Sequence, residues 1–324
     1  MSSVERFARL FAHLRSDTNR MRYPDETRHR APHKPLLLLA VLDLFAEGAI
    51  QDGRVPVGPE IGEAFSRYWH RVMPPDHRPN MALPFFHLQR DGGFWTLVAT
   101  PGNEPALEHT PQIRTMSVLT NLVACARLDP ELVRCLSVPR ERDELRDVLV
   151  RRYFSPEAQA RLLEQARVNV EAYRYSEMLL SRRIVAEARA VEEYLPVARG
   201  QGFRRAVVMA YAYRCAMCGI RVLTADGRTA VEAAHIHAWS VSRNDDPTNG
   251  LALCRLCHWS FDEGLLGADR LRSILVSPQL SREPNVPGHL AQLAQRPLIG
   301  PGDARLAPDV DALGWHRRHV FRAR

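Results

Sequence analysis

Four cysteines in two Cys-x2-Cys pairs constrain this chain more than any other feature. Cys215 and Cys218 form the first pair, and Cys254 and Cys257 form the second after an interval of 35 residues. Two pairs at such spacing are typical of structural zinc, which four thiolates surround as a tetrahedron. The ion replaces much of the hydrophobic core that roughly 60 residues could hardly build alone. The pattern favours a reducing cytoplasm over a disulfide-bonded, secreted protein.

The remaining composition fits a folded protein of two or three domains. The chain has 324 residues, of which 45% are hydrophobic and 25% are charged. Its longest apolar runs, Leu36–Leu42 and Ala206–Tyr213, are far shorter than the ~20 residues of a membrane span. The N-terminus lacks the apolar stretch of a signal peptide. The net charge of +7 is compatible with a polyanionic partner. Nearly all the basic residues are arginines, and Lys34 is the sole lysine.

The first half of the chain has the hydrophobic pattern of a helix-rich domain. Apolar residues at helical spacing predict helices over residues 4–15, 36–45 and 59–72, and two or three more over 117–153. Residues 85–98 predict two short strands around an Asp-Gly-Gly turn, which is a hairpin pattern. Cys125 and Cys135 are expected to be buried small hydrophobes in helical sequence.

The second half begins with a helical stretch and ends in a loop-like tail. Residues 155–197 predict one or two long helices, and the two glycines of residues 199–203 predict a domain boundary. The segment 278–308 is rich in proline and glycine, and the last residues predict a final helix.

The order of three polar residues within the cysteine-rich region is informative about function. An alternating, strand-like run leads to His235, Asn249 follows, and His258 comes directly after the last cysteine. With the runs EAAHI, NGLALC and CHWSFDEGL in this order, residues 203–270 resemble the HNH (ββα-metal) endonuclease family. The resemblance implies metal-dependent hydrolysis of phosphodiester bonds in DNA.

That resemblance assigns roles residue by residue. His235 would be the general base, and Asn249 would hold the connecting loop and orient His235 through a hydrogen bond. His258 would bind the catalytic Mg²⁺ or Mn²⁺, and Asp262, four residues later on the same helix face, is the candidate second ligand. Four-thiolate zinc would be structural.

The chain departs from the family pattern at one position. Ala234 stands where many members carry a metal-binding Asp or His before the catalytic histidine. Glu232, on the same side of a strand as Ala234, is either a substitute ligand or a structural residue. His237 either binds phosphate or is a solvated loop histidine.

Two stretches of the N-terminal region carry a second resemblance. APHKPLLLLAVLDLF (31–45) and LPFFHLQRDGGFWTL (83–97) resemble the DNA sulfur-binding domain of modification-dependent (type IV) restriction endonucleases, over residues 1–155. That domain reads phosphorothioated DNA. Sulfur is larger, softer and less strongly hydrated than the oxygen it replaces, so a shallow apolar pocket favours it.

The second resemblance also assigns residues. Pro84 would touch the sulfur with Leu83 and His87 nearby, while His33 and Lys34 would contact the modified phosphate. Leu83 replaces the aromatic residue expected before this proline.

Gln89 and Arg90, at the predicted hairpin turn, would reach base edges. The structural alternatives are that residues 33–35 only begin a helix, that Phe85 and Phe86 are core, and that Arg90 is solvated.

Together these observations predict an α+β chain with three parts. Residues 1–155 would form the helix-rich reader with a small β-hairpin, 156–200 a helical connector, and 201–324 the HNH endonuclease domain with its C-terminal tail. The protein would cut double-stranded, phosphorothioated DNA as a defence, as a homodimer because each strand needs its own active site. Alternatives are an HNH endonuclease that reads a methylated or hydroxymethylated base or no modification, and a zinc-containing DNA-binding protein without hydrolysis.

Overall fold

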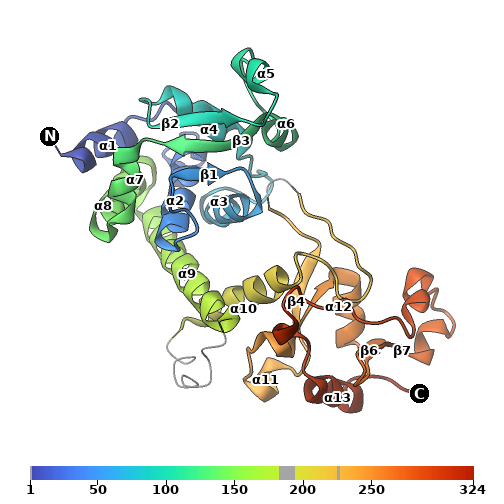
Figure 1. The fold of residues 1–324 in the computed structure, drawn as a ribbon. Helices are drawn as coiled ribbons and strands as arrows, with labels where there is room; N and C mark the ends of the chain where they lie inside the picture. Colours follow the sequence, from blue (N-terminus) through green and yellow to red (C-terminus); the bar gives the residue numbers. More distant parts are fainter. Residues whose placement is uncertain (1, 182–193, 225–226) are drawn as a thin grey trace. The chain divides into compact units, whose positions relative to one another are not determined.

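The computed structural model describes residues 2–181, 194–224 and 227–324, which form two compact units (Figure 1). Unit 1 comprises Met1–Val170 with Thr224–Arg228, and unit 2 comprises Glu171–Leu223 with Thr229–Arg324. The division falls inside one long helix, α9 (Pro156–Leu180). Whether the three predicted functional parts follow these limits stays a prediction, because compactness alone does not define function.

Unit 1 is mostly helical, with one small sheet. Its other helices are α1 (Ser3–Ala12), α2 (His33–Ala46), α3 (Pro59–Val72), α4 (Ala82–His87), α5 (Glu104–Glu108), α6 (Met116–Leu122), α7 (Pro130–Ser137) and α8 (Pro139–Tyr153), with short 3-10 turns η1 (Asp25–Thr27) and η2 (Leu88–Arg90). The strands β1 (Arg54–Pro56), β2 (Trp95–Ala99) and β3 (Val123–Leu128) form an antiparallel sheet in the order β1-β3-β2.

Helix α2 is the centre of unit 1. Its residues from Pro35 to Phe45 are all buried, which explains why the run is apolar all round instead of on one face. One polar residue, Asp43, lies in this buried stretch. It accepts hydrogen bonds from Arg146 (2.7 Å), Tyr68 (2.6 Å) and Asn169 (2.7 Å), so its charge is paired inside the core. The helices predicted over 4–15, 36–45 and 59–72 are confirmed as α1, α2 and α3.

The predicted hairpin over residues 85–98 is wrong. Residues 82–87 form α4 and 88–90 form η2, while β2 pairs with the distant strand β3, for example Leu97 opposite Ala126. Phe85 and Phe86 are both buried in the same core. Consecutive residues of a strand face opposite sides, whereas one turn of helix directs both rings inward. Trp95 fixes this turn by donating to the Phe85 carbonyl at 2.9 Å.

A second correction concerns the segment expected to be wholly helical, residues 117–153. It contains β3 between α6 and α7, so Cys125 lies half-buried in a strand rather than in a helix. Cys135 is buried in α7, as expected. Phe85 and Phe86 are core residues, which confirms the structural alternative for both.

Unit 2 builds a smaller core from short elements. Its helices are α10 (Pro196–Ala210), α11 (Trp239–Ser242), α12 (Arg255–Asp262) and α13 (Val310–His319). Its strands are β4 (Val231–His235), β5 (Gly250–Cys254), β6 (Leu266–Ala268) and β7 (Ile274–Val276), paired as β4-β5 and β6-β7. Its described residues also form the 3-10 turns η5 (Pro247–Asn249), η6 (Pro278–Ser281), η7 (Gly288–Leu293) and η8 (Ala304–Leu306). Helices α10 and α12 both pack against β4 and β5.

The glycines at 200 and 202 do not break the chain. Both lie inside α10, so no loop interrupts the chain there, and the functional boundary expected at residues 199–203 stays a prediction. A Cβ at Gly202 would lie 2.6 Å from the carbonyl oxygen of Ala172, so this glycine permits two helix backbones to approach closely. Residues 182–193 of the predicted connector lie outside the described residues.

The C-terminal expectations are confirmed. Residues 278–308 hold short 3-10 turns, and α13 is the final helix. Within the described ranges, no helix has both the length and the apolar character to cross a bilayer.

Candidate functional sites

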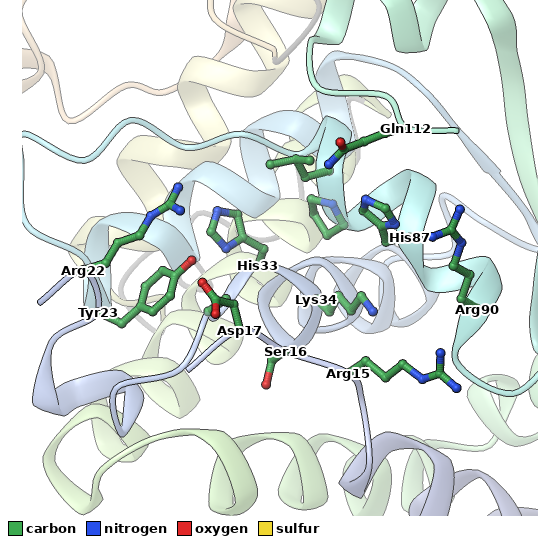
Figure 2. A pocket seen from close by; sticks show the side chains of 13 residues that line it. Arg15, Ser16, Asp17, Arg22, Tyr23, His33, Lys34, His87, Arg90 and Gln112 are labelled. Atoms are coloured by element: carbon green, nitrogen blue, oxygen red, sulfur yellow. The ribbon is translucent and has the colours of Figure 1, made fainter. Parts of the chain in front are cut away.

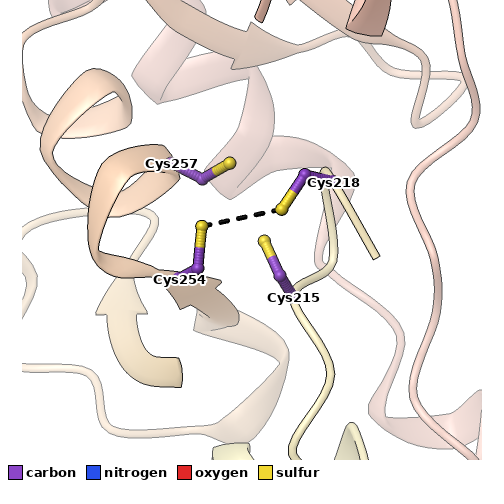
Figure 3. Close-up of side chains that lie close together, drawn as sticks. All are labelled: Cys215, Cys218, Cys254 and Cys257. Atoms are coloured by element: carbon purple, nitrogen blue, oxygen red, sulfur yellow. Dashed lines mark hydrogen bonds between the residues drawn. The ribbon is translucent and has the colours of Figure 1, made fainter. Parts of the chain in front are cut away.

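The four paired cysteines gather into one cluster in unit 2 (Figure 3). Their sulfur atoms lie within 4.8 Å of one another, and the Sγ atoms of Cys218 and Cys254 are 3.6 Å apart. Sulfurs bound tetrahedrally at ~2.3 Å from one zinc ion would be about 3.8 Å apart. The donor set and its spacing therefore fit a metal ion with a preference for thiolates.

Local structure explains how the four thiols meet. Cys215 and Cys218 lie on a tight turn that ends at Gly219, whose φ of 77° favours glycine. Cys254 ends β5 and caps α12, and Cys257 lies in the first turn of that helix. Hydrogen bonds from the neighbouring thiols lower the pKa of Cys215, which favours the thiolate that a metal needs.

His235, the last residue of β4, is held on two sides. Its ring stacks on Phe203 of α10 with centroids 3.8 Å apart and planes 7° apart. Its Nε2 lies 2.8 Å from Oδ1 of Asp245, in the loop between α11 and η5. Gly250 faces His235 across the ladder, and a Cβ there would lie 2.5 Å from Val207, so only glycine lets α10 approach. The imidazole is therefore fixed before any substrate binds.

Asn249 holds the loop but does not contact the His235 ring. Its Oδ1 accepts from the His237 amide at 2.9 Å, and its Nδ2 donates to the carbonyls of His237 (3.0 Å) and Asn244 (2.9 Å). The loop-holding part of the prediction is therefore confirmed. The predicted hydrogen bond from Asn249 to His235 is wrong, because Asp245 takes that position.

His258 lies on α12 between two carboxylates. Its Nε2 is 3.4 Å from Asp262 Oδ2 on the same helix face, as the four-residue spacing predicts. Its Nδ1 is 3.5 Å from Glu232 Oε2 on β4. Burial raises the pKa of Asp262, partly offset by His258. The two carboxylates lie at opposite ring nitrogens, so one cation bound to His258 has only one of them beside it. Imidazole with one carboxylate fits a hard divalent cation such as Mg²⁺ or Mn²⁺.

Among the alternatives left open around His235, the role of Glu232 stays a prediction. Ala234 is buried, and its methyl group offers no ligand atom for a cation. Glu232 reaches His258 and also lies 3.3 Å from the Arg255 guanidinium. The solvated alternative for His237 is wrong, because its ring is half-buried and stacks on Trp315 at 3.9 Å.

Unit 1 contains a pocket of about 470 Å³ (Figure 2). Six of the seven residues predicted to bind DNA line it. They are His33, Lys34, Leu83, Pro84, His87 and Arg90. In Figure 2, Lys34 extends from the start of α2 toward the side of the pocket formed by His87 and Arg90.

One helical face explains this convergence. Leu83 and Pro84 lie four and three residues before His87, and Arg90 lies three residues after it, so the four side chains share one side of α4 and η2. Gln89 does not share it. Its amide donates to the Phe86 carbonyl at 2.9 Å, and it lines a separate groove of about 570 Å³ with Glu104 and Glu108.

The pocket is electropositive, although its histidines are held neutral. Burial lowers the pKa of His33 to about 4, assisted by Arg22, and burial also lowers the pKa of His87. Lys34 pairs with the buried carboxylate of Asp91. No side chain caps the N-terminus of α2, so its first N–H groups add positive potential where His33 and Lys34 lie.

Sequence reasoning missed several residues of both sites. Arg15, Ser16, Asp17, Arg22, Tyr23, Ala31 and Gln112 also line the pocket. Around His235 it missed Phe203 and Asp245, together with the two contacts of Asp245, the Tyr175 hydroxyl at 2.9 Å and Arg199 Nε at 3.5 Å. A carboxylate between the two motif residues His235 and Asn249 was the available signal for Asp245. No sequence pattern near Tyr175 or Arg199 indicates that these residues lie beside Asp245.

Comparisons with known proteins assign both units. Residues 215–268 match the HNH endonuclease family, so unit 2 carries an HNH endonuclease domain. Residues 11–171 match the ScoMcrA-like DNA sulfur-binding domain, so the chain combines a DNA sulfur-binding domain with an HNH domain.

The whole-chain comparisons add little. A solved structure titled "Modification dependent TagI restriction endonuclease" is 23% identical to this chain, with a TM-score of 0.29. The match covers 36% of this chain and 37% of the chain in that structure. The chain thus spans little more than a third of that relative's length. No curated protein matches.

Proposed function

We propose that this chain is a modification-dependent (type IV) restriction endonuclease that recognises phosphorothioated double-stranded DNA and hydrolyses phosphodiester bonds near the mark. It would act in the cytoplasm, as a defence against incoming modified DNA. The observation that carries the proposal is the convergence of His33, Lys34, Leu83, Pro84, His87 and Arg90 on one pocket of the sulfur-binding domain.

The chemistry of that pocket suits a phosphorothioate. Leu83 and Pro84 offer an apolar surface that sulfur tolerates better than the strongly hydrated oxygen. Lys34, Arg90 and the start of α2 supply the positive potential that the negative charge requires. His33 and His87 are neutral near pH 7, so they present ring edges and hydrogen bonds rather than charge.

The nuclease centre supplies the hydrolysis. His235 takes a proton from water while the water oxygen forms a bond to phosphorus. The bond from phosphorus to the leaving oxygen breaks, and that oxygen takes a proton from solvent. His258 with Asp262 or Glu232 would hold Mg²⁺ or Mn²⁺, which supplies stabilisation of charge on the phosphate and the leaving oxygen. The four cysteines would hold structural Zn²⁺.

A reader of a methylated or hydroxymethylated base is less well supported. Such readers extrude the base into an aromatic pocket. The aromatic residues of the segment 85–95, Phe85, Phe86, Phe94 and Trp95, are all core residues with at most 2% of their surface exposed. We also propose a homodimer, because cutting both strands requires two centres.

The first experiment compares cleavage of two plasmids of identical sequence, one phosphorothioated and one plain, with Mg²⁺ or Mn²⁺. The proposal expects cutting of the phosphorothioated plasmid alone, and loss of that cutting in His235→Ala. Equal cutting of both would discard the sulfur reader and keep the nuclease. Failure to cut either would favour another modification or a non-catalytic DNA-binding protein.

The single lysine gives a second, independent measurement. In protein labelled only with ¹⁵N-lysine, the backbone amide spectrum contains one signal, that of Lys34 at the start of α2. A phosphorothioated duplex should move this signal at concentrations at which the plain duplex leaves it unchanged. Identical titrations with both duplexes would refute the pocket assignment.

A further inference from the structure

We infer that α9 and α10, which lie outside the segment matched by the HNH family, hold the general base His235 in its reactive orientation through Asp245. The inference rests on the proposed nuclease function and deepens it. Asp245, Tyr175 and Arg199 are positioning residues in this scheme, since none of them touches the reacting atoms.

Asp245 is the junction of the arrangement. Only 5% of its side chain is exposed. Its Oδ1 lies 2.8 Å from His235 Nε2, and its Oδ2 accepts from the Tyr175 hydroxyl at 2.9 Å. Arg199 Nε is 3.5 Å from the same Oδ2. A buried carboxylate costs free energy unless it is paired, and here three elements supply the partners.

This contact selects one form of the imidazole. An ionised carboxylate only accepts hydrogen bonds, so the ring proton lies on Nε2, and Nδ1 keeps the lone pair. Among the described residues, no hydrogen bond to Nδ1 is found. The Phe203 ring, stacked at 3.8 Å, fixes the plane of the imidazole. The nitrogen that accepts the proton from water is therefore Nδ1, and its direction is set in advance.

Helices α9 and α10 fix Asp245 in turn. Burial raises the pKa of Tyr175 well above its usual value, so the hydroxyl stays a donor. The Arg199 guanidinium also stacks on Trp239 at 3.5 Å, and Arg243 covers the same ring at 4.0 Å. Arg199 therefore ties the loop that joins His235 to Asn249 onto α10. The family match begins at residue 215, so both positioning side chains lie outside the matched segment.

The test measures the ring directly as well as the rate. In full-length protein with ¹⁵N-labelled histidine, the His235 signals are those absent from His235→Ala. We expect a single neutral form protonated on Nε2 in the wild type, and a mixture of forms in Asp245→Asn. With phosphorothioated DNA, we expect Asp245→Asn to lower kcat at least 10-fold with little change in KM. The loss should not exceed the roughly 10²–10⁴-fold that a general base contributes to the rate.

A matched pair of tyrosine variants removes one hydroxyl each. Tyr175→Phe deletes a donor to Asp245, whereas Tyr211→Phe deletes a buried hydroxyl of unit 2 that has no hydrogen-bond partner among the described residues. We expect a kcat about 2- to 10-fold lower for Tyr175→Phe, the effect of one hydrogen bond, and an unchanged kcat for Tyr211→Phe. If Asp245→Asn does not fold, this pair decides the inference.

The double variant separates positioning from simple stability. Once His235 is alanine, Asp245→Asn should not lower the residual rate further. Additive losses would overturn the inference, as would normal kcat in both Asp245→Asn and Tyr175→Phe, or a wild-type ring protonated on Nδ1. Normal cleavage by His235→Ala would instead refute the proposed general base itself, so the two failures are distinguishable.

Discussion

The reading pocket and the nuclease centre are held in place by different physical means. The pocket lies on α2 and α4, whose other faces belong to an apolar core built from Leu36 to Leu42 and from Phe85 and Phe86. The candidate nuclease centre lies on strands and helices of at most eight residues, apart from α9 and α10. Its side chains are fixed by a four-thiol cluster and by polar contacts to Asp245 and Asn249.

This difference has a consequence for how each site fails. Unit 1 derives its rigidity from buried apolar surface, which does not depend on metal or redox state. Under the proposed function, unit 2 would depend on a metal for its fold and on single hydrogen bonds for its geometry. Changes at the cysteines or at His235 should therefore silence cutting and leave reading intact, whereas changes in the pocket should alter the choice of target alone.

The largest effect is expected from Cys254→Ser. Replacing one thiolate should release the zinc and unfold unit 2, because structural zinc contributes roughly 10–16 kcal/mol in small zinc-bound folds. Zinc per chain is measured by atomic absorption, and the ¹⁵N-lysine signal of Lys34 reports on unit 1, where it should not move. Cys125→Ser, in β3 and outside the cluster, is the control and should retain zinc. Full zinc content in Cys254→Ser would contradict the four-thiolate site.

Next in size is the effect of His235→Ala on chemistry alone. Removing the general base should slow cleavage roughly 10²–10⁴-fold, while the affinity for phosphorothioated DNA stays the same. Rates are measured at saturating Mg²⁺ or Mn²⁺, and affinity by fluorescence anisotropy without divalent metal. His289→Ala, at an exposed histidine of η7, should change neither quantity. If binding and cleavage fall together, His235 is a structural residue.

A smaller, selective effect is expected from Leu83→Asn. A polar side chain in the pocket would tolerate hydrated oxygen better, so the preference for phosphorothioated over plain duplex should fall roughly 10-fold. The ratio of the two dissociation constants is the quantity to measure. Leu163→Asn, on the half-exposed side of α9 and outside the pocket, is the matched control. An unchanged ratio in Leu83→Asn would mean that this apolar surface does not select sulfur.

The sequence was a good guide wherever one local pattern had one structural meaning. The apolar run from Leu36, the cysteine pairs and the four-residue step from His258 to Asp262 each allow a single interpretation. Residues 85–98 did not, because two adjacent phenylalanines and an Asp-Gly-Gly turn fit a hairpin as well as a helical turn. The strand partner that decides between them, β3, is about 30 residues away.

The contacts that hold His235 could not be predicted for a related reason. Asp245 and Tyr175 are 70 residues apart in the chain, and their hydrogen bond exists only after α9 and the catalytic loop have packed. Asn249 was expected to contact the His235 ring because the motif joins them. In the fold, its amide is used entirely by backbone groups of the loop.

The smallest effect at neutral pH, and the most informative about unit 1, concerns His33. Burial lowers its pKa from 6.5 to about 4, so between these values the unfolded chain binds a proton that the folded chain does not. Stability is therefore fully present above pH 6.5 and falls as the pH drops towards 4, by up to about 3 kcal/mol. His33→Gln should flatten this dependence, measured as hydrogen exchange of the α2 amides at pH 7.5 and 5 after correction for intrinsic rates.

His316 makes the stability of unit 2 depend on pH in the same direction, because burial lowers its pKa to about 4 as well. In unit 2, however, acid also protonates the thiolates. Unit 2 should therefore lose stability more steeply, and an equal slope in both units would argue that the thiolates hold no metal.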